Sequence, residues 1–365
     1  MDIVQSDKAV KRFRRHTKEE RKQEKVRHKG KKREEERRER LQRKSKLVSS
    51  IGIQTDQVAS SQIKSRGAQM VIASRERNPN VVGKVNTQTA KPVVVSKPAY
   101  KSAPLIRNQD LTKPAEGYPV SVGEGSFGTC EFMFYRGNIP VVVKSYKSHV
   151  SRDEVNAEAS SLMELQKPSP HPCLPLLLGI HVADKPYLLV TQFHGNGQTS
   201  HTVSSAIRAS LLESGREWYL FLEKLVKAVS FMHSKQWLHN DIKHNNVVCH
   251  LSQEIWQPVL IDFGKSLKFV DARKTSMKRC PKDYPWIAPE IVKGEARKSI
   301  EGDVFSLGYL MKYVAHRVAE CRSAHFSDLY NKFMSIIPSH RPSLQFVARE
   351  LHEFTKLPQE QLGCT

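Results

Sequence analysis

The chain has 365 residues, with 59 Lys and Arg against 37 Asp and Glu, and a formal net charge of +22. This length allows two or three domains, and 39% hydrophobic residues suit a folded part with a polar extension. There is no apolar run long enough for a membrane span and no secretory signal, so we expect no membrane association. The six Cys show no C-x-x-C spacing, so we expect neither a zinc site nor a disulfide framework. Together these features favour a cytoplasmic or nuclear location.

The positive charge is concentrated at the N-terminus. Residues 1–110 contain 29 Lys and Arg against 12 Asp and Glu, which leaves a net charge of only +5 for the other 255 residues. We predict a basic segment at 1–46, helical where pairs such as Glu34 and Arg38 support an exposed helix. Residues 47–112 turn to Ser, Gln, Val, Asn and Lys with scattered Pro, which predicts a disordered linker.

Three interpretations of residues 8–46 stay open. The segment can be a solvated tail, it can bind nucleic acid or another polyanion by releasing counterions, or it can direct nuclear import. Import would use the basic clusters KRFRR at 11–15 and KGKKR at 29–33.

A pattern of strands begins near residue 115. The stretch YPVSVGEGSFGTCEFMFYRGNIPVVVKSYK (118–147) alternates in polarity and is interrupted by glycines, which predicts strands joined by turns. Its GEGSFG segment places Gly123, Gly125 and Gly128 in a G-x-G-x-x-G array. In dinucleotide-binding folds such an array opens a helix, whereas here it lies between two strands. A hairpin with a glycine tip allows backbone N–H groups to approach phosphates.

A buried ion pair is predicted between the next two elements. Lys144 lies in the apolar strand VVVKSYK, where a cation requires a partner. The segment SRDEVNAEASSLMELQK (151–167) predicts a helix with Glu158 on the same broad side as Leu162 and Leu165. We expect Lys144 and Glu158 to pair, although a surface ion pair of little energetic value is the alternative.

The chain then changes from strands to helices. LPLLLGIHVA (174–183) and PYLLVTQFHG (186–195) predict two apolar strands, and residues 202–212 and 216–236 predict helices. The stretch WLHNDIKHNNVVCH (237–250) follows, and its dense polar side chains indicate a turn or a site.

Five motifs occur in the order GEGSFG, VVVK, HNDIKHNN (239–246), DFG (262–264) and APE (288–290). In these motifs the sequence from about 115 to 355 resembles a eukaryotic-type protein kinase, most closely the serine/threonine type, with HND in place of HRD. The resemblance implies an α+β, two-lobed fold with a small strand-rich N-lobe and a larger helical C-lobe, preceded by the basic, disordered or helical tail. The expected domain spans 113–357, with the N-lobe at about 113–193, the C-lobe at about 196–357 and a C-terminal tail at 358–365.

The resemblance also implies roles for individual residues in the transfer of the γ-phosphate of Mg-ATP to protein hydroxyls. Asp241 would accept or orient the hydroxyl proton and Lys243 would contact the γ-phosphate. Asn246 and Asp262 would hold Mg²⁺. The residues expected to form the ATP site, with Thr191 as gatekeeper and the three that follow it as hinge, are Gly123, Glu124, Gly125, Ser126, Phe127, Gly128, Cys130, Val142, Lys144, Glu158, Thr191, Gln192, Phe193 and His194.

Structural roles follow from the same resemblance. Glu290 is expected to pair with Arg341 in SHRPS, and Asp303 is expected to brace the backbone of the 239–246 loop. His239 is expected to be a buried, hydrogen-bonded residue.

Departures from the family pattern modify these expectations. Asn240 replaces the usual Arg, so we predict activity that does not require phosphorylation of the activation loop. Val142 replaces the usual Ala and could narrow the adenine site. Lys243 is typical of serine/threonine kinases, whereas Trp286 is similar to tyrosine kinases. The basic activation loop suggests acidic protein substrates. The alternative functions are a pseudokinase scaffold, or an adaptor that docks to a polyanion through the basic tail.

Overall fold

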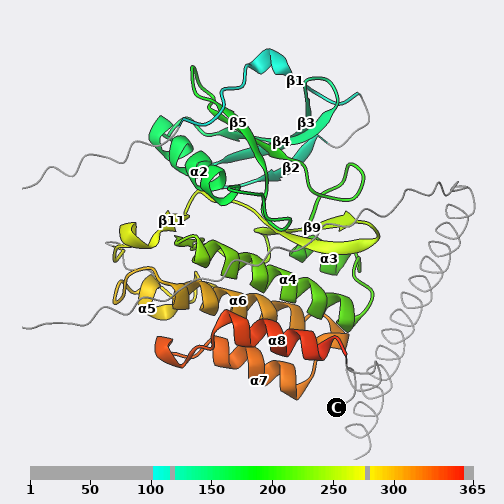
Figure 1. Cartoon of the computed structure of the whole chain (residues 1–365), viewed down its shortest axis with the longest axis vertical. Coiled ribbons are helices and arrows are strands. Elements are labelled where there is room, and N and C mark those ends of the chain that lie inside the picture. The colour runs from blue at the N-terminus through cyan, green and yellow to red at the C-terminus, as the bar shows by residue number, and fades with distance from the viewer. Residues whose placement is uncertain (1–101, 116–119, 276–279, 357–365) are drawn as a thin grey trace, which may run out of the picture. The chain divides into compact units, whose positions relative to one another are not determined.

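The computed structural model describes residues 102–115, 120–275 and 280–356, and these form an α+β domain of two lobes (Figure 1). The two-lobed fold predicted from the sequence is therefore confirmed. The basic segment at 1–46, most of the predicted linker and the C-terminal tail lie outside the described residues. No described helix is long and apolar enough to cross a lipid bilayer.

The N-lobe is a curled antiparallel sheet with one long helix against it (Figure 1). Its elements are η1 (Asn108–Asp110), β1 (Leu111–Thr112), β2 (Ser121–Glu124), β3 (Gly128–Tyr135), β4 (Ile139–Tyr146), α2 (Arg152–Leu165), β5 (Leu177–His181) and β6 (Leu188–Gln192). The strand order is β1-β3-β4-β6-β5, with β2 paired to β3. Helix α2 begins with a capping box, in which Ser151 Oγ accepts from the Glu154 N–H and the Glu154 carboxylate accepts from the Ser151 N–H.

Residues 102–112 also belong to the N-lobe, so the predicted linker was too long at its C-terminal end. The Ile106 side chain is buried with Val141 and Val190, and its N–H donates to the Ile180 carbonyl at 2.8 Å. Leu111 pairs with Tyr135 of β3. The sequence did not reveal this segment because only isolated apolar residues in it are buried, among polar neighbours.

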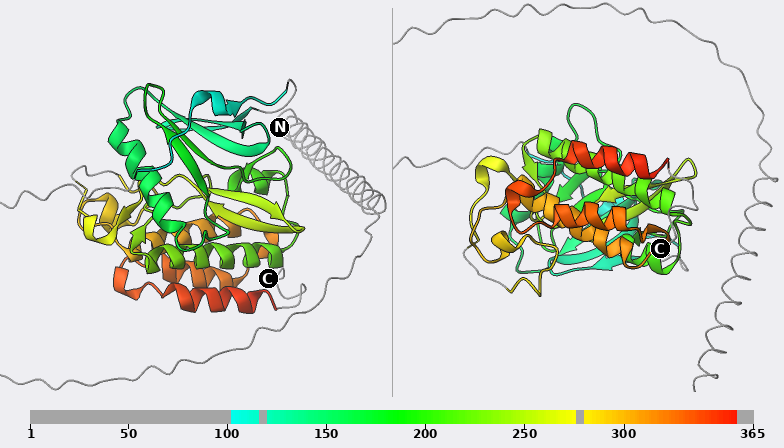
Figure 2. Two further views of the ribbon diagram at one scale, coloured as in Figure 1. Left: turned by 45° about the horizontal axis from the view of Figure 1, so that its top comes forward. Right: turned by 90° about the horizontal axis from the view of Figure 1, so that it is seen from below.

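The C-lobe consists mainly of stacked helices, and the view from below shows α7 and α8 on its lower face (Figure 2). Its longer elements are α3 (Val203–Arg208), α4 (Gly215–Ser234), β9 (Val247–Ser252), β10 (Ile255–Leu260), α6 (Ile300–Ala315), α7 (Ala324–Phe333) and α8 (Leu344–Phe354). Its shorter elements are β7 (His201–Thr202), β8 (Trp237–Leu238), β11 (Leu267–Lys268), η2 (Phe269–Asp271), α5 (Pro289–Val292), η3 (Ala319–Cys321) and η4 (Pro338–His340).

The C-lobe core is aromatic where three of its helices meet. Tyr219 of α4 lies 5.1 Å from Phe326 of α7 and 4.9 Å from Phe354 of α8, measured between ring centroids. All three rings are buried. This packing fixes α4 as a rigid base for the loop at 237–246, which carries the polar residues of the predicted site.

Candidate active site

The glycine-rich segment forms the tip of the hairpin between β2 and β3, as predicted. A Cβ atom at Gly123 would meet no atom within 4 Å, so the space beside it is open. Gly128 is required for a different reason, because a Cβ there would lie only 2.2 Å from the Ser145 carbonyl oxygen of β4. The tip therefore packs closely on the sheet and leaves room next to its first glycine for a ligand.

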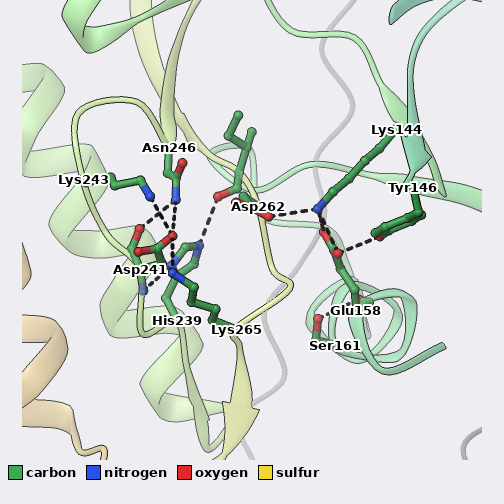
Figure 3. Close-up of polar contacts among 11 residues, drawn as sticks. Lys144, Tyr146, Glu158, Ser161, His239, Asp241, Lys243, Asn246, Asp262 and Lys265 are labelled. Atoms are coloured by element: carbon green, nitrogen blue, oxygen red, sulfur yellow. Dashed lines mark hydrogen bonds and ion pairs between the residues drawn. The ribbon is translucent and has the colours of Figure 1, made fainter. Parts of the chain in front are cut away.

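The predicted ion pair between Lys144 and Glu158 is present (Figure 3). Lys144 Nζ lies 2.9 and 3.0 Å from the two Glu158 oxygens and 2.9 Å from Asp262 Oδ1. Burial alone would lower the pKa of the Lys144 ammonium, but the two carboxylates outweigh it and raise the pKa above the ordinary value. The lysine is therefore a fixed positive charge that joins β4, α2 and the DFG segment.

Tyr146 supplies a second donor to the same glutamate. Its hydroxyl donates to Glu158 Oε2 at 2.6 Å, and the Lys144 ammonium lies 5.1 Å from the centroid of its ring. Burial and the Glu158 charge raise the pKa of the phenol well above the ordinary value, so the phenol stays protonated and donates. Glu158 is thus bound from two sides.

Asp241 lies at the centre of a dense set of donors (Figure 3). Its Oδ2 atom accepts from Lys243 Nζ at 2.9 Å and Asn246 Nδ2 at 3.1 Å, and Lys265 Nζ lies 3.1 Å from the same atom. Its Oδ1 atom accepts from Trp286 Nε1 at 2.8 Å. Burial raises the pKa of Asp241, but Lys265, Lys243 and the indole N–H outweigh it, and the net pKa is below the ordinary value. The carboxylate is therefore ionised at neutral pH.

The backbone beside Asp241 is held by Asp303 of α6, as predicted. Asp303 Oδ2 accepts from the His239 N–H at 2.9 Å, and Oδ1 accepts from the Asn240 N–H at 2.8 Å. Asn240 has φ +65°, a left-handed conformation that Asn tolerates better than most residues. His239 is fully buried, accepts the Asp241 N–H at its Nδ1 atom and places Nε2 3.2 Å from the Ile261 carbonyl. The structural roles expected of His239 and Asp303 are confirmed.

The oxygens of Asn246 and Asp262 fit a hard divalent cation. Asn246 Nδ2 donates to the Asp241 carbonyl at 2.8 Å and to its carboxylate, which leaves the amide oxygen as an acceptor. Asp262 uses Oδ1 for Lys144, and no described residue binds its Oδ2 atom. Burial raises the pKa of Asp262, but Lys144 outweighs it, so the group is ionised. Two free oxygens on facing segments are the ligands that Mg²⁺ prefers.

The predicted hinge begins at Gln192, the last residue of β6. Thr191 is half-buried and Gln192 is exposed, whereas Phe193 and His194 are buried. Phe193 packs on Phe132 of β3, with ring centroids 4.8 Å apart. The His194 backbone N–H donates to none of the described residues, so it is available to a ligand.

Cys130 and Val142 lie on neighbouring strands near this hinge. Val142 is half-buried and pairs with Thr191 of β6, next to the hinge. Cys130 pairs with Lys144, and burial raises the pKa of its thiol to about 11. The thiol is therefore protonated at neutral pH and adds no charge beside Lys144.

The segment that ends in APE is fixed to the C-lobe. Arg341 Nη1 and Nη2 donate to the two Glu290 oxygens at 2.7 and 2.9 Å, which confirms the predicted pair. Ser306 of α6 donates to the Trp286 carbonyl at 2.6 Å. Lys243 Nζ lies 4.9 Å from the centroid of the Trp286 ring.

Three residues of the site were missed in the sequence. Tyr146, Lys265 and Trp286 each bind a carboxylate of the site, but Lys265 and Tyr146 belong to no motif that we used, and Trp286 was noted only for its similarity to tyrosine kinases. The position of Lys265 directly after the DFG motif was the one available signal.

Comparisons with known proteins agree with this geometry. The family model for the protein kinase domain matches residues 119–356. The human serine/threonine-protein kinase TNNI3K is 29% identical over 199 residues, which are 51% of this chain and 22% of the relative. The Aurora kinase of Schizosaccharomyces pombe is 28% identical over 191 residues, which are 52% of this chain and 51% of the relative. The chain thus spans about half or less of the length of these relatives.

Proposed function

Because the chain belongs to the protein kinase family, we propose that it transfers the γ-phosphate of ATP to serine and threonine hydroxyls of proteins. One observation carries the proposal. The ionised Asp241, with Lys243 on its carboxylate, and the Lys144–Glu158 pair are both assembled, and Asp262 contacts that pair through Lys144. Phosphoryl transfer depends on such positioning and charge neutralisation rather than on covalent help from the protein.

The charge of each site residue indicates its role in phosphate transfer. Lys144 would hold the α- and β-phosphates, and Lys243 would neutralise charge on the transferred group. Asp241 would accept or orient the proton of the acceptor hydroxyl, for which its ionised state is required. Asn246 and Asp262 would hold Mg²⁺, which when bound neutralises the phosphate oxygens. The open space at Gly123 and the available His194 N–H suit the phosphates and the nucleobase.

The choice of serine and threonine rests on two observations. Lys243 stands two residues after Asp241 and contacts its carboxylate at 2.9 Å. The human relative is a serine/threonine-protein kinase by name. Trp286 is the feature that is similar to tyrosine kinases, and phosphoamino-acid analysis separates the two classes.

We also propose that activity does not require phosphorylation of the activation loop. Asn240 replaces the cation that would read a phosphate there, and its side chain instead donates to the Lys265 carbonyl at 3.1 Å. The segment is already held by the bonds of Trp286 and Glu290 to the C-lobe. Removal of all phosphate by a phosphatase should leave the transfer rate unchanged.

Finer proposals concern partners and location. The cations of the activation segment favour acidic protein substrates, although Lys268 is already paired with Glu164 at 2.9 Å. Equal rates on acidic and basic peptide sets would contradict this preference. The charge of residues 8–46 supports a polyanionic partner, and the absence of C-x-x-C spacing supports a cytoplasmic or nuclear location.

The decisive experiment is transfer of labelled phosphate from Mg-ATP by the full chain, beside the Asp241→Asn variant. We expect label on serine and threonine of protein substrates with the natural chain and none with the variant. Nucleotide binding without transfer by either chain would favour the alternative of a scaffold. In that case the hydrogen bonds from Lys243, Asn246 and Trp286 and the nearby Lys265 charge would explain why the Asp241 carboxylate does not act on a hydroxyl.

A further inference from the structure

The two oxygens of the Asp241 carboxylate are unequally occupied. A carboxylate oxygen accepts roughly two hydrogen bonds. Oδ2 accepts hydrogen bonds from Lys243 and Asn246 and also lies 3.1 Å from the Lys265 ammonium, whereas among the described residues the Trp286 indole is the one donor to Oδ1. An acceptor hydroxyl can therefore reach the carboxylate at Oδ1, beside the indole.

Lys265 is held in place by the residue that departs from the family pattern. The Asn240 amide donates to the Lys265 carbonyl at 3.1 Å, and the Asn240 N–H is fixed by Asp303. The Lys265 ammonium then reaches Asp241 Oδ2, with its side chain about one third exposed. Asn240 thus holds the backbone of Lys265, the residue directly after the DFG motif.

Trp286 contacts the other oxygen of the Asp241 carboxylate, Oδ1. Its indole N–H lies 2.8 Å from Oδ1, and its carbonyl is fixed by Ser306 of α6. The Lys243 ammonium lies over its ring. The indole can neither rotate freely nor leave without breaking these contacts.

We propose that Lys265 and Trp286 are positioning residues that hold the Asp241 carboxylate from its two oxygens, so that the acceptor hydroxyl binds Oδ1 next to the indole. The inference rests on the proposed kinase function. Loss of either contact should leave the carboxylate less firmly oriented toward the acceptor hydroxyl.

The test compares Lys265→Gln with Lys265→Arg and a matched control. Lys293→Gln is the control, because Lys293 is exposed and its contact with the Glu295 carboxylate is long, at 4.0 Å. We expect Lys265→Gln to lower kcat about 10-fold, the size of one contact between charged groups, with little change in KM for ATP. Lys265→Arg should restore kcat, and Lys293→Gln should leave it unchanged.

A second readout does not depend on turnover. The chain has four Trp, and Trp286→Phe identifies the indole N–H resonance of Trp286 by its disappearance. Because that N–H binds Oδ1, its chemical shift should report whether the indole keeps its contact with the carboxylate. The shift should change in Lys265→Gln and stay unchanged in Lys293→Gln.

The outcomes separate the two proposals. An unchanged indole chemical shift in a folded Lys265→Gln variant would overturn the positioning role, and so would a kcat loss that Lys265→Arg does not restore. If the natural chain transfers no phosphate but the indole shift changes as expected, the proposed function fails while the hold of Lys265 on the carboxylate stands. Trp286→Phe should lower kcat by a few-fold to about 10-fold with little change in KM for ATP. A rise in KM for ATP as large as the fall in kcat would contradict the positioning role of Trp286.

Discussion

Arg341 binds Glu290 with both ends of its guanidinium, across 51 residues of sequence. The arginine side chain is fully buried, and it also donates to the carbonyls of Glu301 and Ser335. One cation therefore joins the APE segment, the start of α6 and the turn before η4. Its neighbours supply acceptors in the planar arrangement that only arginine matches.

We expect Arg341→Lys to lower the free energy of unfolding by about 3 kcal/mol, because a buried carboxylate and two carbonyls lose donors. Urea unfolding followed by fluorescence would measure it. Lys356→Ala is the control, because its pair with Glu353 is exposed and its loss should be too small to resolve. A change no larger than that of the control would show that the guanidinium geometry is unimportant.

Lys144→Met should reduce phosphate transfer about 100-fold or more, because it removes the cation shared by Glu158 and Asp262. Single-turnover transfer with excess ATP measures the effect. Lys147→Met, which removes an exposed lysine 3.6 Å from Glu124, should change the rate little. Similar rates for the two variants would refute the role of Lys144.

Tyr146→Phe removes only the hydroxyl that donates to Glu158, and should lower the free energy of unfolding by about 1 kcal/mol. Tyr135→Phe is a suitable control, since its hydroxyl bonds to no described residue. A double-mutant cycle with Glu158→Gln would show coupling between the two side chains. Additive effects would mean that the short bond contributes nothing of its own.

The Asp303 carboxylate should make stability depend on acid pH. Burial raises its pKa, but His233 and the backbone N–H of His239 outweigh it and hold the pKa below the ordinary 3.8. A lowered pKa adds stability that is complete above the ordinary value and is lost as the pH falls through the folded value. Asp303→Asn should therefore be less stable than the natural chain at neutral pH, and the difference should shrink toward about pH 3.

Urea unfolding at several pH values between about 3 and 7 would measure this difference. Glu295→Gln is the matched control, because that glutamate is exposed and its contact with Lys293 is long, at 4.0 Å. A gap between Asp303→Asn and the natural chain that stays constant over this range would argue against a titrating carboxylate at α6.

The motif residues could be predicted because the proposed chemistry requires particular atoms at fixed spacings. The sequence predicts the pairs Lys144–Glu158 and Glu290–Arg341, and the structure contains both. Each pair joins two segments whose order and spacing are typical of the family.

The supporting donors could not be predicted, because their positions depend on how distant side chains turn toward each other. The Trp286 indole reaches Asp241 from 45 residues away, and no spacing in the sequence specifies that direction. Asn240 replaces the Arg of the family pattern, and the sequence therefore predicts that a cation is missing at this position. The Lys265 and Lys298 side chains nevertheless line the same cavity as Asn240. The positive charge that Asn240 lacks is thus present beside it on two lysines from other segments of the chain.

The short stretch before β1 has a practical consequence for any shortened form of this protein. β5 is the last strand of its sheet, and Pro104 and Ile106 exchange backbone hydrogen bonds with Ile180 along its open side. Gly179 allows this close approach, because a Cβ there would lie 2.4 Å from the Pro104 carbonyl oxygen. A chain cut at residue 113 would keep every motif and still expose an unpaired strand edge with apolar side chains. Such an edge invites strand-to-strand association, so solubility rather than catalysis would decide where the chain can be cut.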